Sequence, residues 1–278
     1  MTIDFENHRA LNVLVTGAAG AIGTCLRAGL KGRYRLLRLM DRVPQSAAGP
    51  GEEVVTGDVL DLPLMETCMQ GIDVVVHLAG IPGEDRWENI RDANIEGCFN
   101  LFEAARRQQV PRVVFASSNH AVGFYRTNQR IDAQVPVRPD TLYGVSKVFG
   151  EALGRLAADK RGMSVACLRI GSFRADDKPV EPRHLATWIS HRDLVQLTTR
   201  CIEAASYHFF IVYGLSANTR AMWDNAGLEW LRYQPVDDAE SHASALVIAE
   251  AGDSTIGAAF HGGSLCDIGF EGRADQIH

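Results

Sequence analysis

The sequence predicts an α/β fold in which a doubly wound parallel sheet is covered by helices on both faces. Short, continuously apolar runs alternate with stretches of helical length, which is the pattern of successive βαβ units. The first run, residues 11–16, enters a glycine-rich turn at 17–23, and a helical stretch follows at 24–31. The 278 residues, of which 46% are hydrophobic and 22% charged, suffice for a large core.

The remaining elements of this Rossmann-type core are expected in a regular order. The second apolar run, residues 35–40, ends at Asp41, and the stretch 44–51 is a loop because it is rich in Pro, Gly, Ala and Ser. We then expect strands at 53–56, 73–78, 112–116 and 164–170, alternating with helices at 61–70, 87–108 and 143–160.

The pattern loosens after the last of these strands, where residues 174–182 are polar and contain two prolines. A helix at 191–205 and a strand at 209–213 are still expected. We therefore predict that residues 1–172 form the core, which the glycine-rich turn at 17–23 indicates to be the NAD-binding part. Residues 173–278 are predicted to form a small substrate-binding portion, interwoven with the core as one structural unit.

Composition and charge argue against several classes of function. A net charge of −6 and a pI near 5.8 give no electrostatic case for binding nucleic acid or an anionic membrane. No run approaches the roughly 18 apolar residues of a membrane span, and the polar residues 1–10 lack a signal-peptide core. The six cysteines form no Cys-x-x-Cys pair, which predicts reduced thiols and no metal site. We expect a cytoplasmic enzyme.

Gly17, Gly20 and Gly23 lie where the first strand turns into the first helix. Small residues at this turn let backbone amides and the helix N-terminus approach a pyrophosphate. Asp41, at the end of the second strand, can accept hydrogen bonds from ribose hydroxyls and would repel a 2′-phosphate. The sequence therefore predicts NAD as the cofactor, while the neighbouring Arg42 leaves NADP open.

Further positions border the predicted cofactor site. Asp58 follows a short strand, and its carboxylate either receives the adenine amino group or serves as a helix N-cap or turn acid. The fourth strand ends in Leu78, Ala79 and Gly80, where small residues allow a flat ring system to approach.

Tyr143 and Lys147 are the chemically most informative pair. Residues four apart share one face of a helix, so the phenol and the ammonium are predicted to lie side by side. Lowering a tyrosine pKa from about 10 to about 7 takes about 4 kcal/mol, which one ammonium about 4 Å away supplies at an effective dielectric of about 20. The hydroxyl of Ser117 or Ser118 could then hold a substrate oxygen while Tyr143 takes its proton. An ordinary helix with an exposed lysine is the alternative.

The glycine turn, the serines and the Tyr-x-x-x-Lys spacing together resemble the extended short-chain dehydrogenases/reductases, over roughly residues 11–172. Several segments are further similar to the uronate dehydrogenases, a family related to the NAD-dependent epimerases and dehydratases. These segments occur in both halves of the chain, at residues 114–120, 142–151, 169–172, 187–191, 216–218 and 223–225.

This resemblance implies roles for individual residues. Tyr143 would be the catalytic base, Ser118 would be the hydroxyl nearest the reacting oxygen, and Lys147 would bind the nicotinamide ribose and lower the Tyr143 pKa. Arg183 would clamp the uronate carboxylate, with Arg174 as its rival. The other implied substrate contacts are Ser118, Asn119, His120, Ser172 and Leu265. The implied NAD contacts are Gly17, Gly20, Ala21, Ile22, Gly23, Asp41, Asp58, Val59, Leu78, Ala79, Gly80, Asn94, Tyr143, Lys147, Ile170 and Phe173.

The implied activity is NAD-dependent oxidation of free hexuronic acids, D-galacturonate or D-glucuronate, at C1 to the aldarolactone, by a homo-oligomeric enzyme. Two positions depart from the family: Pro82 replaces a substrate-contacting serine, and Leu265 replaces an aromatic residue. A nucleotide-sugar epimerase or dehydratase is an alternative, although dehydratases generally place carboxylates where this chain has Asn119 and His120. A non-catalytic dinucleotide sensor is a second alternative, but such relatives usually lack the tyrosine or the lysine.

Overall fold

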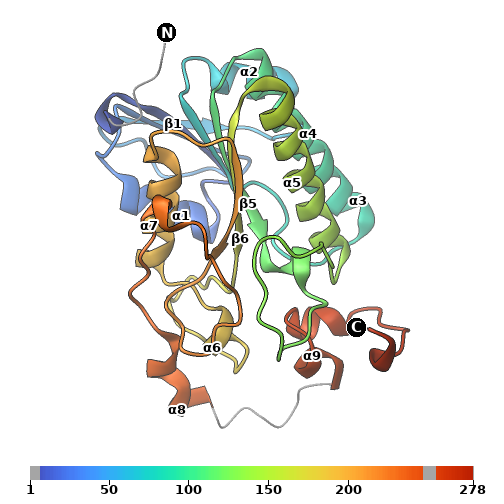
Figure 1. The fold of residues 1–278 in the computed structure, drawn as a ribbon. Helices are drawn as coiled ribbons and strands as arrows, with labels where there is room; N and C mark the ends of the chain where they lie inside the picture. The colour runs from blue at the N-terminus through green and yellow to red at the C-terminus, as the bar shows by residue number, and fades with distance from the viewer. Residues whose placement is uncertain (1–6, 247–254, 278) are drawn as a thin grey trace.

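The computed structural model describes residues 7–246 and 255–277 and contains a sheet of seven parallel strands (Figure 1). Residues 1–6, part of the polar N-terminal stretch, lie outside these ranges. The spatial order is β3-β2-β1-β4-β5-β6-β7, so the predicted doubly wound α/β fold is confirmed. The strands are β1 (Asn12–Thr16), β2 (Leu36–Asp41), β3 (Glu52–Thr56), β4 (Val74–His77), β5 (Arg112–Ser118), β6 (Ser164–Ile170) and β7 (Phe209–Gly214).

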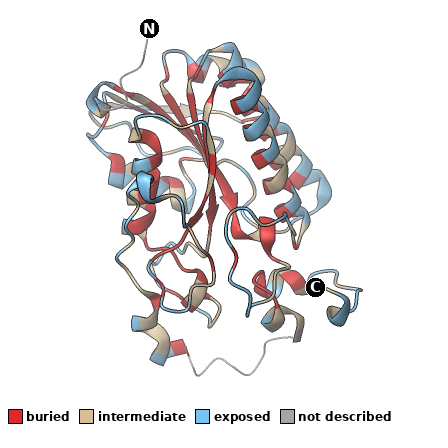
Figure 2. Ribbon diagram, in the orientation of Figure 1, coloured by how far each residue is buried: buried red, intermediate tan, exposed pale blue. Residues whose placement is uncertain are grey.

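Helices cover both faces of this sheet, and the strands between them consist largely of buried residues (Figure 2). On one face α1 (Ala21–Leu30) packs with α7 (His191–Glu203). On the other face α2 (Leu62–Met69), α4 (Gly97–Arg107) and α5 (Leu142–Arg161) pack together. The shorter helices are α3 (Trp87–Ile90), α6 (His184–Thr187), α8 (Ala243–Leu246) and α9 (Thr255–Ala259). None of the helices in the described ranges is long and apolar enough to cross a membrane.

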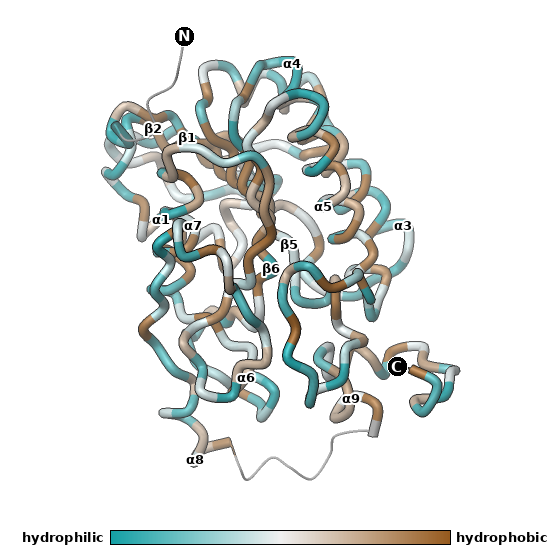
Figure 3. Tube along the Cα trace, viewed as in Figure 1, coloured by the Kyte–Doolittle hydropathy of each residue, from teal (hydrophilic) through white to brown (hydrophobic). Residues whose placement is uncertain are grey.

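The central strands are strongly apolar because both of their faces are covered (Figure 3). Every residue of β4 and of β5 is buried. The helices start where a polar side chain satisfies a free backbone N–H group. The side chains of Asp61, Thr141 and Ser190 accept such a bond in the first turns of α2, α5 and α7.

The helix expected at 87–108 is less regular than its sequence suggests. Between α3 and α4, the residues Arg91–Glu96 form a π-helical segment. Asn94 lies within it, and its Oδ1 accepts the backbone N–H of Ile81 at 2.7 Å. Single π-helical turns are frequent near functional sites, and apolar periodicity does not reveal them.

β7 comes from the C-terminal portion of the chain and completes the sheet beside β6. The side chain of Asn225 covers part of the edge of β7 that faces away from β6. The backbone N–H of Tyr213 donates to Asn225 Oδ1 at 2.8 Å, and Asn225 Nδ2 donates to Tyr213 O at 2.9 Å. The sheet therefore draws on both predicted portions of the chain.

Candidate active site

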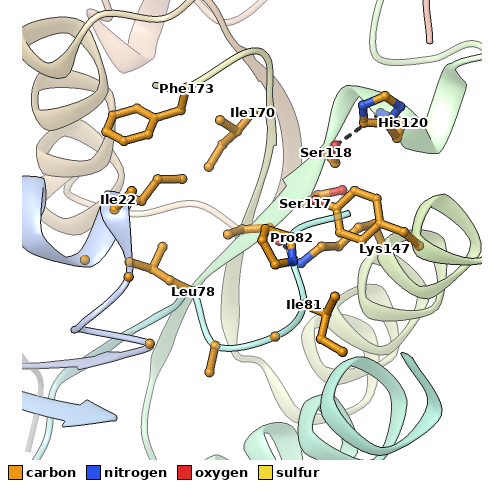
Figure 4. A pocket seen from close by; sticks show the side chains of 18 of the residues that line it. Ile22, Leu78, Ile81, Pro82, Ser117, Ser118, His120, Lys147, Ile170 and Phe173 are labelled. Atoms are coloured by element: carbon orange, nitrogen blue, oxygen red, sulfur yellow. Dashed lines mark hydrogen bonds between the residues drawn. The ribbon is translucent and has the colours of Figure 1, made fainter. Parts of the chain in front are cut away.

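A cavity of about 690 Å³ opens at the carboxyl ends of the central strands, the edge at which parallel α/β sheets bind ligands. Its walls are formed by the glycine turn after β1, the loop after β4, the start of α5 and a turn near the C-terminus that contains Gly262 and Leu265. Figure 4 shows Ile22, Leu78, Ile170 and Phe173 at one end and Ser118, His120 and Lys147 at the other.

The glycine turn brings backbone segments so close that side chains would not fit. Gly17 has a φ of +72°, and a Cβ there would lie 2.6 Å from the backbone nitrogen of Ala79. A Cβ on Gly23 would overlap the carbonyl oxygen of Gly17. The first turn of α1, from Ala21, borders the cavity, and its free N–H groups can hold a phosphate.

Two carboxylates stand at the next strand ends. Asp41 accepts the backbone N–H of Ala19 at 2.8 Å and that of Val43 at 2.9 Å, and it lines the cavity. Asp58 also lines the cavity and accepts the N–H of Leu60 at 3.0 Å. It is a turn acid in this structure, and its carboxylate still has lone pairs for a ligand.

Most residues predicted to contact NAD line this cavity. They are Gly17, Gly20, Ala21, Ile22, Gly23, Asp41, Asp58, Val59, Leu78, Ala79, Gly80, Tyr143, Lys147, Ile170 and Phe173. Asn94 differs, because its amide is bonded to Ile81 and donates to Ser146 Oγ at 3.0 Å. It packs against Gly80, where a Cβ would lie 2.8 Å from Asn94 Oδ1. Asn94 therefore holds the cavity-lining residues Gly80 and Ile81 in place and does not line the cavity itself.

The cavity brings Tyr143, Lys147 and Ser118 together where β5 ends and α5 begins. The Ser118 hydroxyl lies close enough to the Tyr143 phenol to lower the phenol's pKa. The hydroxyl of Ser117 instead donates to Glu151 at 2.6 Å. Of the two candidate serines, Ser118 is thus the one whose hydroxyl faces the phenol.

Burial, and not Lys147, has the largest effect on the pKa of Tyr143 in this structure. Burial raises the pKa of Tyr143 to about 12, and the Ser118 hydroxyl offsets only part of this rise. Burial also lowers the pKa of Lys147 to about 8. The ammonium donates to Ala116 O at 3.0 Å and lies 5.4 Å from the centroid of the phenol ring. Loss of water therefore has the largest effect on the pKa of each group.

Two other residues that line the cavity carry hydrogen-bond donors with no partner in the described part of the chain. Arg183 Nε donates to His261 O at 2.7 Å and Nη1 donates to Ser172 Oγ at 3.4 Å. Its Nη2 and the Nδ2 of Asn119 are buried and have no partner in the described part of the chain. Unpaired buried donors are costly, so they favour a ligand with acceptor oxygens. The rival Arg174 has an exposed side chain.

The other residues predicted to contact substrate border the same space. His120, Ser172 and Leu265 line the cavity, as does Pro82, which departs from the family pattern. The Ser172 hydroxyl is also bonded to Thr187 Oγ1 at 2.6 Å. The predicted substrate residues therefore converge from the ends of β5 and β6 and from the C-terminal portion.

Sequence reasoning missed two carboxylates behind these residues. Glu84 Oε2 accepts the backbone N–H of Tyr143 at 2.9 Å. Asp140 has a fully buried side chain, and its Oδ2 lies 2.6 Å from Nδ1 of His120. An acid just before an expected helix is ordinarily interpreted as a cap, so neither partnership had a sequence signal.

The fold and the site define a dinucleotide-dependent enzyme of the short-chain dehydrogenase type. The sequence pattern of the NAD dependent epimerase/dehydratase family matches residues 13–197. The chain therefore belongs to this family.

Within that family the chain is similar to uronate dehydrogenases, as its sequence segments predicted. It is 43% identical to uronate dehydrogenase of Pseudomonas putida over 84% of this chain and 87% of that protein. The crystal structure of uronate dehydrogenase from Agrobacterium tumefaciens matches with a TM-score of 0.88 and 41% identity, over 93% of this chain and 97% of that chain. A tyrosine-to-alanine variant of that enzyme, solved with NAD, matches equally well. Glucuronic acid dehydrogenase from Chromohalobacter salexigens matches with a TM-score of 0.87 and 38% identity, over 96% and 99% of the two chains.

Proposed function

We propose that this protein oxidises free hexuronic acids, such as D-galacturonate and D-glucuronate, at C1 to the aldarolactone, with NAD as the hydride acceptor. The observation that carries the proposal is one cavity lined both by a phenol close to a serine hydroxyl and by a guanidinium with a nitrogen that has no partner in the described residues. The phenol suits proton abstraction from a hydroxyl, and the guanidinium suits a carboxylate. The similarity to uronate dehydrogenases supports the same substrate class.

The residues at one end of the cavity fit NAD. The glycine turn and the start of α1 can hold the pyrophosphate, and Asp41 can accept from the ribose hydroxyls. Apolar side chains, among them Leu78 and Ile170, offer flat surfaces for the rings. Bound NAD would supply the acceptor for the C1 hydride, and the positive charge of its nicotinamide ring would favour the phenolate form of Tyr143.

Proton transfer is the part of the reaction that the protein itself performs. The Ser118 hydroxyl orients the C1 hydroxyl of the sugar towards Tyr143, whose phenolate takes the proton. Lys147 lies beside the phenol and adds positive charge when protonated. The buried surroundings keep water out and strengthen each of these interactions.

Arg183 recognises the far end of the sugar acid. The carbonyl of His261 holds Nε, so Nη1 and Nη2 form the edge that meets the carboxylate. Asn119 donates to a sugar oxygen through its unpaired Nδ2. Pro82 has no hydroxyl to contribute, so one sugar contact made by the family is absent or replaced in this chain.

Three further expectations belong to this proposal. Residues 173–278 contribute to the substrate end of the cavity through Arg183 and Leu265. The chain forms a homo-oligomer, for which exposed apolar side chains such as Phe99 on α4 and Leu156 on α5 are available. The enzyme works in the cytoplasm. Light scattering after size-exclusion chromatography measures the assembly, and a purely monomeric species would contradict it.

An assay of NADH formation over free uronic acids, neutral aldoses and UDP-sugars tests the proposed activity. Uronic acids should be oxidised far more efficiently than the other two classes. Equal turnover of neutral aldoses would contradict both the binding of the substrate carboxylate by Arg183 and the assignment of uronic acids as substrates. Preferential turnover of UDP-sugars would favour a nucleotide-sugar enzyme instead.

The two alternative functions lack a supporting observation in this site. The positions after Ser118 hold Asn119 and His120, where a dehydratase would need acidic groups. A dinucleotide sensor would have no need of a tyrosine and a lysine, and Tyr143 and Lys147 both line the cavity.

A further inference from the structure

The carboxylate of Asp140 has no part in the reaction described above, yet it is buried beside the cavity. Its side chain is 0% exposed, and its Oδ2 lies 2.6 Å from Nδ1 of His120. Its Oδ1 accepts the hydroxyl of Thr141 at 2.9 Å. Each carboxylate oxygen therefore has a polar partner.

Two glycines close the space around this carboxylate. A Cβ on Gly123, which follows β5, would overlap Asp140 Oδ2, and so would a Cβ on Gly262 in the C-terminal portion. Backbone segments from two distant parts of the chain thus approach Asp140 as closely as glycine permits. Such packing leaves the carboxylate no alternative position, so it is a fixed anchor for the ring of His120.

The hydrogen bond to Asp140 determines whether the His120 nitrogen that faces the cavity is a donor or an acceptor. A carboxylate only accepts hydrogen bonds, so Nδ1 of His120 must carry a proton and donate it. In the neutral ring, Nε2 is then a hydrogen-bond acceptor. His120 lines the cavity, its ring lies edge-on to Tyr143 with centroids 6.0 Å apart, and Nε2 makes no hydrogen bond among residues 7–246 and 255–277.

We propose that Asp140 is a positioning residue that holds His120 in the tautomer with an accepting Nε2, so that His120 binds a hydroxyl proton of the sugar. This inference rests on the proposed function, because it takes the ligand to be a free sugar acid. Arg183 and the amide nitrogen of Asn119 can only donate, whereas every sugar hydroxyl also carries a proton that needs an acceptor. His120, oriented by Asp140, supplies that acceptor.

A competing role for Asp140 is to balance a charge. Its carboxylate also attracts the guanidinium of Arg183 electrostatically. In that role Asp140 would act through Arg183 and not through His120. The two roles predict different couplings between substitutions, so a double-mutant cycle separates them.

The first experiment measures kinetics of Asp140→Asn. The Thr141 hydroxyl can still donate to the amide oxygen, which turns the NH2 group towards His120 Nδ1 and favours the opposite tautomer. The KM for the uronate should rise about 10- to 100-fold, with little change in kcat or in the KM for NAD. In a His120→Ala background the same substitution should change the KM less than about twofold.

The proposal is overturned if Asp140→Asn raises the KM equally in the wild-type and the His120→Ala proteins. It is also overturned if the rise persists in His120→Ala but disappears in Arg183→Met. A matched control is available on the surface, where Asp159 lies 2.7 Å from Nε2 of His208. Asp159→Asn removes the carboxylate of a similar pair far from the cavity lining. It should leave the KM for the uronate unchanged.

The second experiment reads the tautomer directly and needs no turnover. In alkaline buffer, the 15N chemical shifts of the wild-type His120 ring should show a protonated Nδ1 and a bare Nε2, and Asp140→Asn should reverse them. A bare Nδ1 in the wild-type protein overturns the proposal even if uronates are oxidised. Conversely, if uronates are not oxidised, the proposed function fails while the tautomer result stands.

Discussion

The hydrogen bond of Arg183 Nε to His261 O leaves the other two guanidinium nitrogens to bind a carboxylate. Because His261 O holds Nε, substituting lysine would remove the planar edge while keeping the charge. We expect Arg183→Lys to raise the KM for the uronate about 100-fold, because a point charge cannot bind a carboxylate bidentately. Steady-state kinetics with NADH absorbance measure this. Arg192→Lys on the exposed face of α7 is the control, and equal effects of the two changes would contradict the role of Arg183.

Tyr143 is expected to carry the proton transfer. Removing its hydroxyl in Tyr143→Phe should lower kcat by about 10²- to 10⁴-fold, the usual contribution of a positioned acid or base. Binding of NAD, measured by calorimetry, should persist because the ring remains in place. Tyr125→Phe, which removes a hydroxyl bonded to Pro136 O on the surface, is the matched control. Near-normal turnover of Tyr143→Phe would exclude this residue as the base.

Lys147 should make the stability of the cofactor-free protein depend on pH. Burial lowers its pKa from 10.5 to about 8. Below about pH 8 the lysine is charged in both states and burial costs about 3 kcal/mol, whereas above about pH 10.5 it is neutral in both and costs nothing. The wild type should therefore gain stability relative to Lys147→Met between these values. Urea unfolding at several pH values measures the difference, and a constant difference would contradict the prediction.

Residue type and spacing were sufficient to predict that Tyr143 and Lys147 lie together, whereas Arg183 was expected only from the family resemblance. They could not predict the direction of the Tyr143 pKa shift, because the depth of burial depends on the whole fold. They also could not predict Asp140 or Glu84 behind the site. The partners of these acids are 20 and 59 residues away along the chain, so they become neighbours only after folding.

At the scale of elements, a buried polar cluster joins α5 to the two strands beneath it. Glu151 on α5 accepts from Arg169 Nε at 2.9 Å and Nη2 at 2.8 Å, and Arg169 belongs to β6. Glu151 also accepts the hydroxyl of Ser117 on β5. These bonds hold the helix that carries Tyr143 against the strand that ends in Ser118.

Removing the charge of Glu151 should therefore weaken the whole arrangement. In Glu151→Gln the guanidinium of Arg169 stays buried without its counter-ion, and the free energy of unfolding should fall by about 3–5 kcal/mol. Urea unfolding measures this fall. Glu103→Gln, which breaks ion pairs with Arg106 and Arg107 on the surface of α4, should change stability little. If the two substitutions lowered the free energy of unfolding equally, the buried Glu151–Arg169 pair would contribute no more to stability than the surface pairs.

The order of the elements was predictable because apolar runs and helical stretches alternate regularly. The expected strand at 164–170 coincides with β6, and the other strands differ by one or two residues at their ends. The π-helical segment Arg91–Glu96 was not predictable. It contains Asn94, whose bonds to Ile81 and Ser146 form only in the folded protein.

At the scale of the whole molecule, cofactor binding should stabilise the fold. A ligand at about 100 times its Kd adds about 2.7 kcal/mol to the free energy of unfolding. NAD should therefore raise the melting temperature, and NADP at the same concentration should raise it much less, because Asp41 repels a 2′-phosphate. Thermal unfolding with each nucleotide measures the two rises in melting temperature. In Asp41→Ala the rise with NADP should come closer to the rise with NAD. Equal shifts with the wild-type protein would contradict the discrimination.

The side chain at the outer edge of β7 has a consequence for the behaviour of many copies in solution. Asn225 imitates a neighbouring strand, since it offers Tyr213 both an acceptor and a donor. An extended segment of another molecule could add to the sheet there only by displacing this amide. Open strand edges are starting points for aggregation. The amide of Asn225 therefore blocks the addition of another strand at Tyr213 on this edge of the sheet.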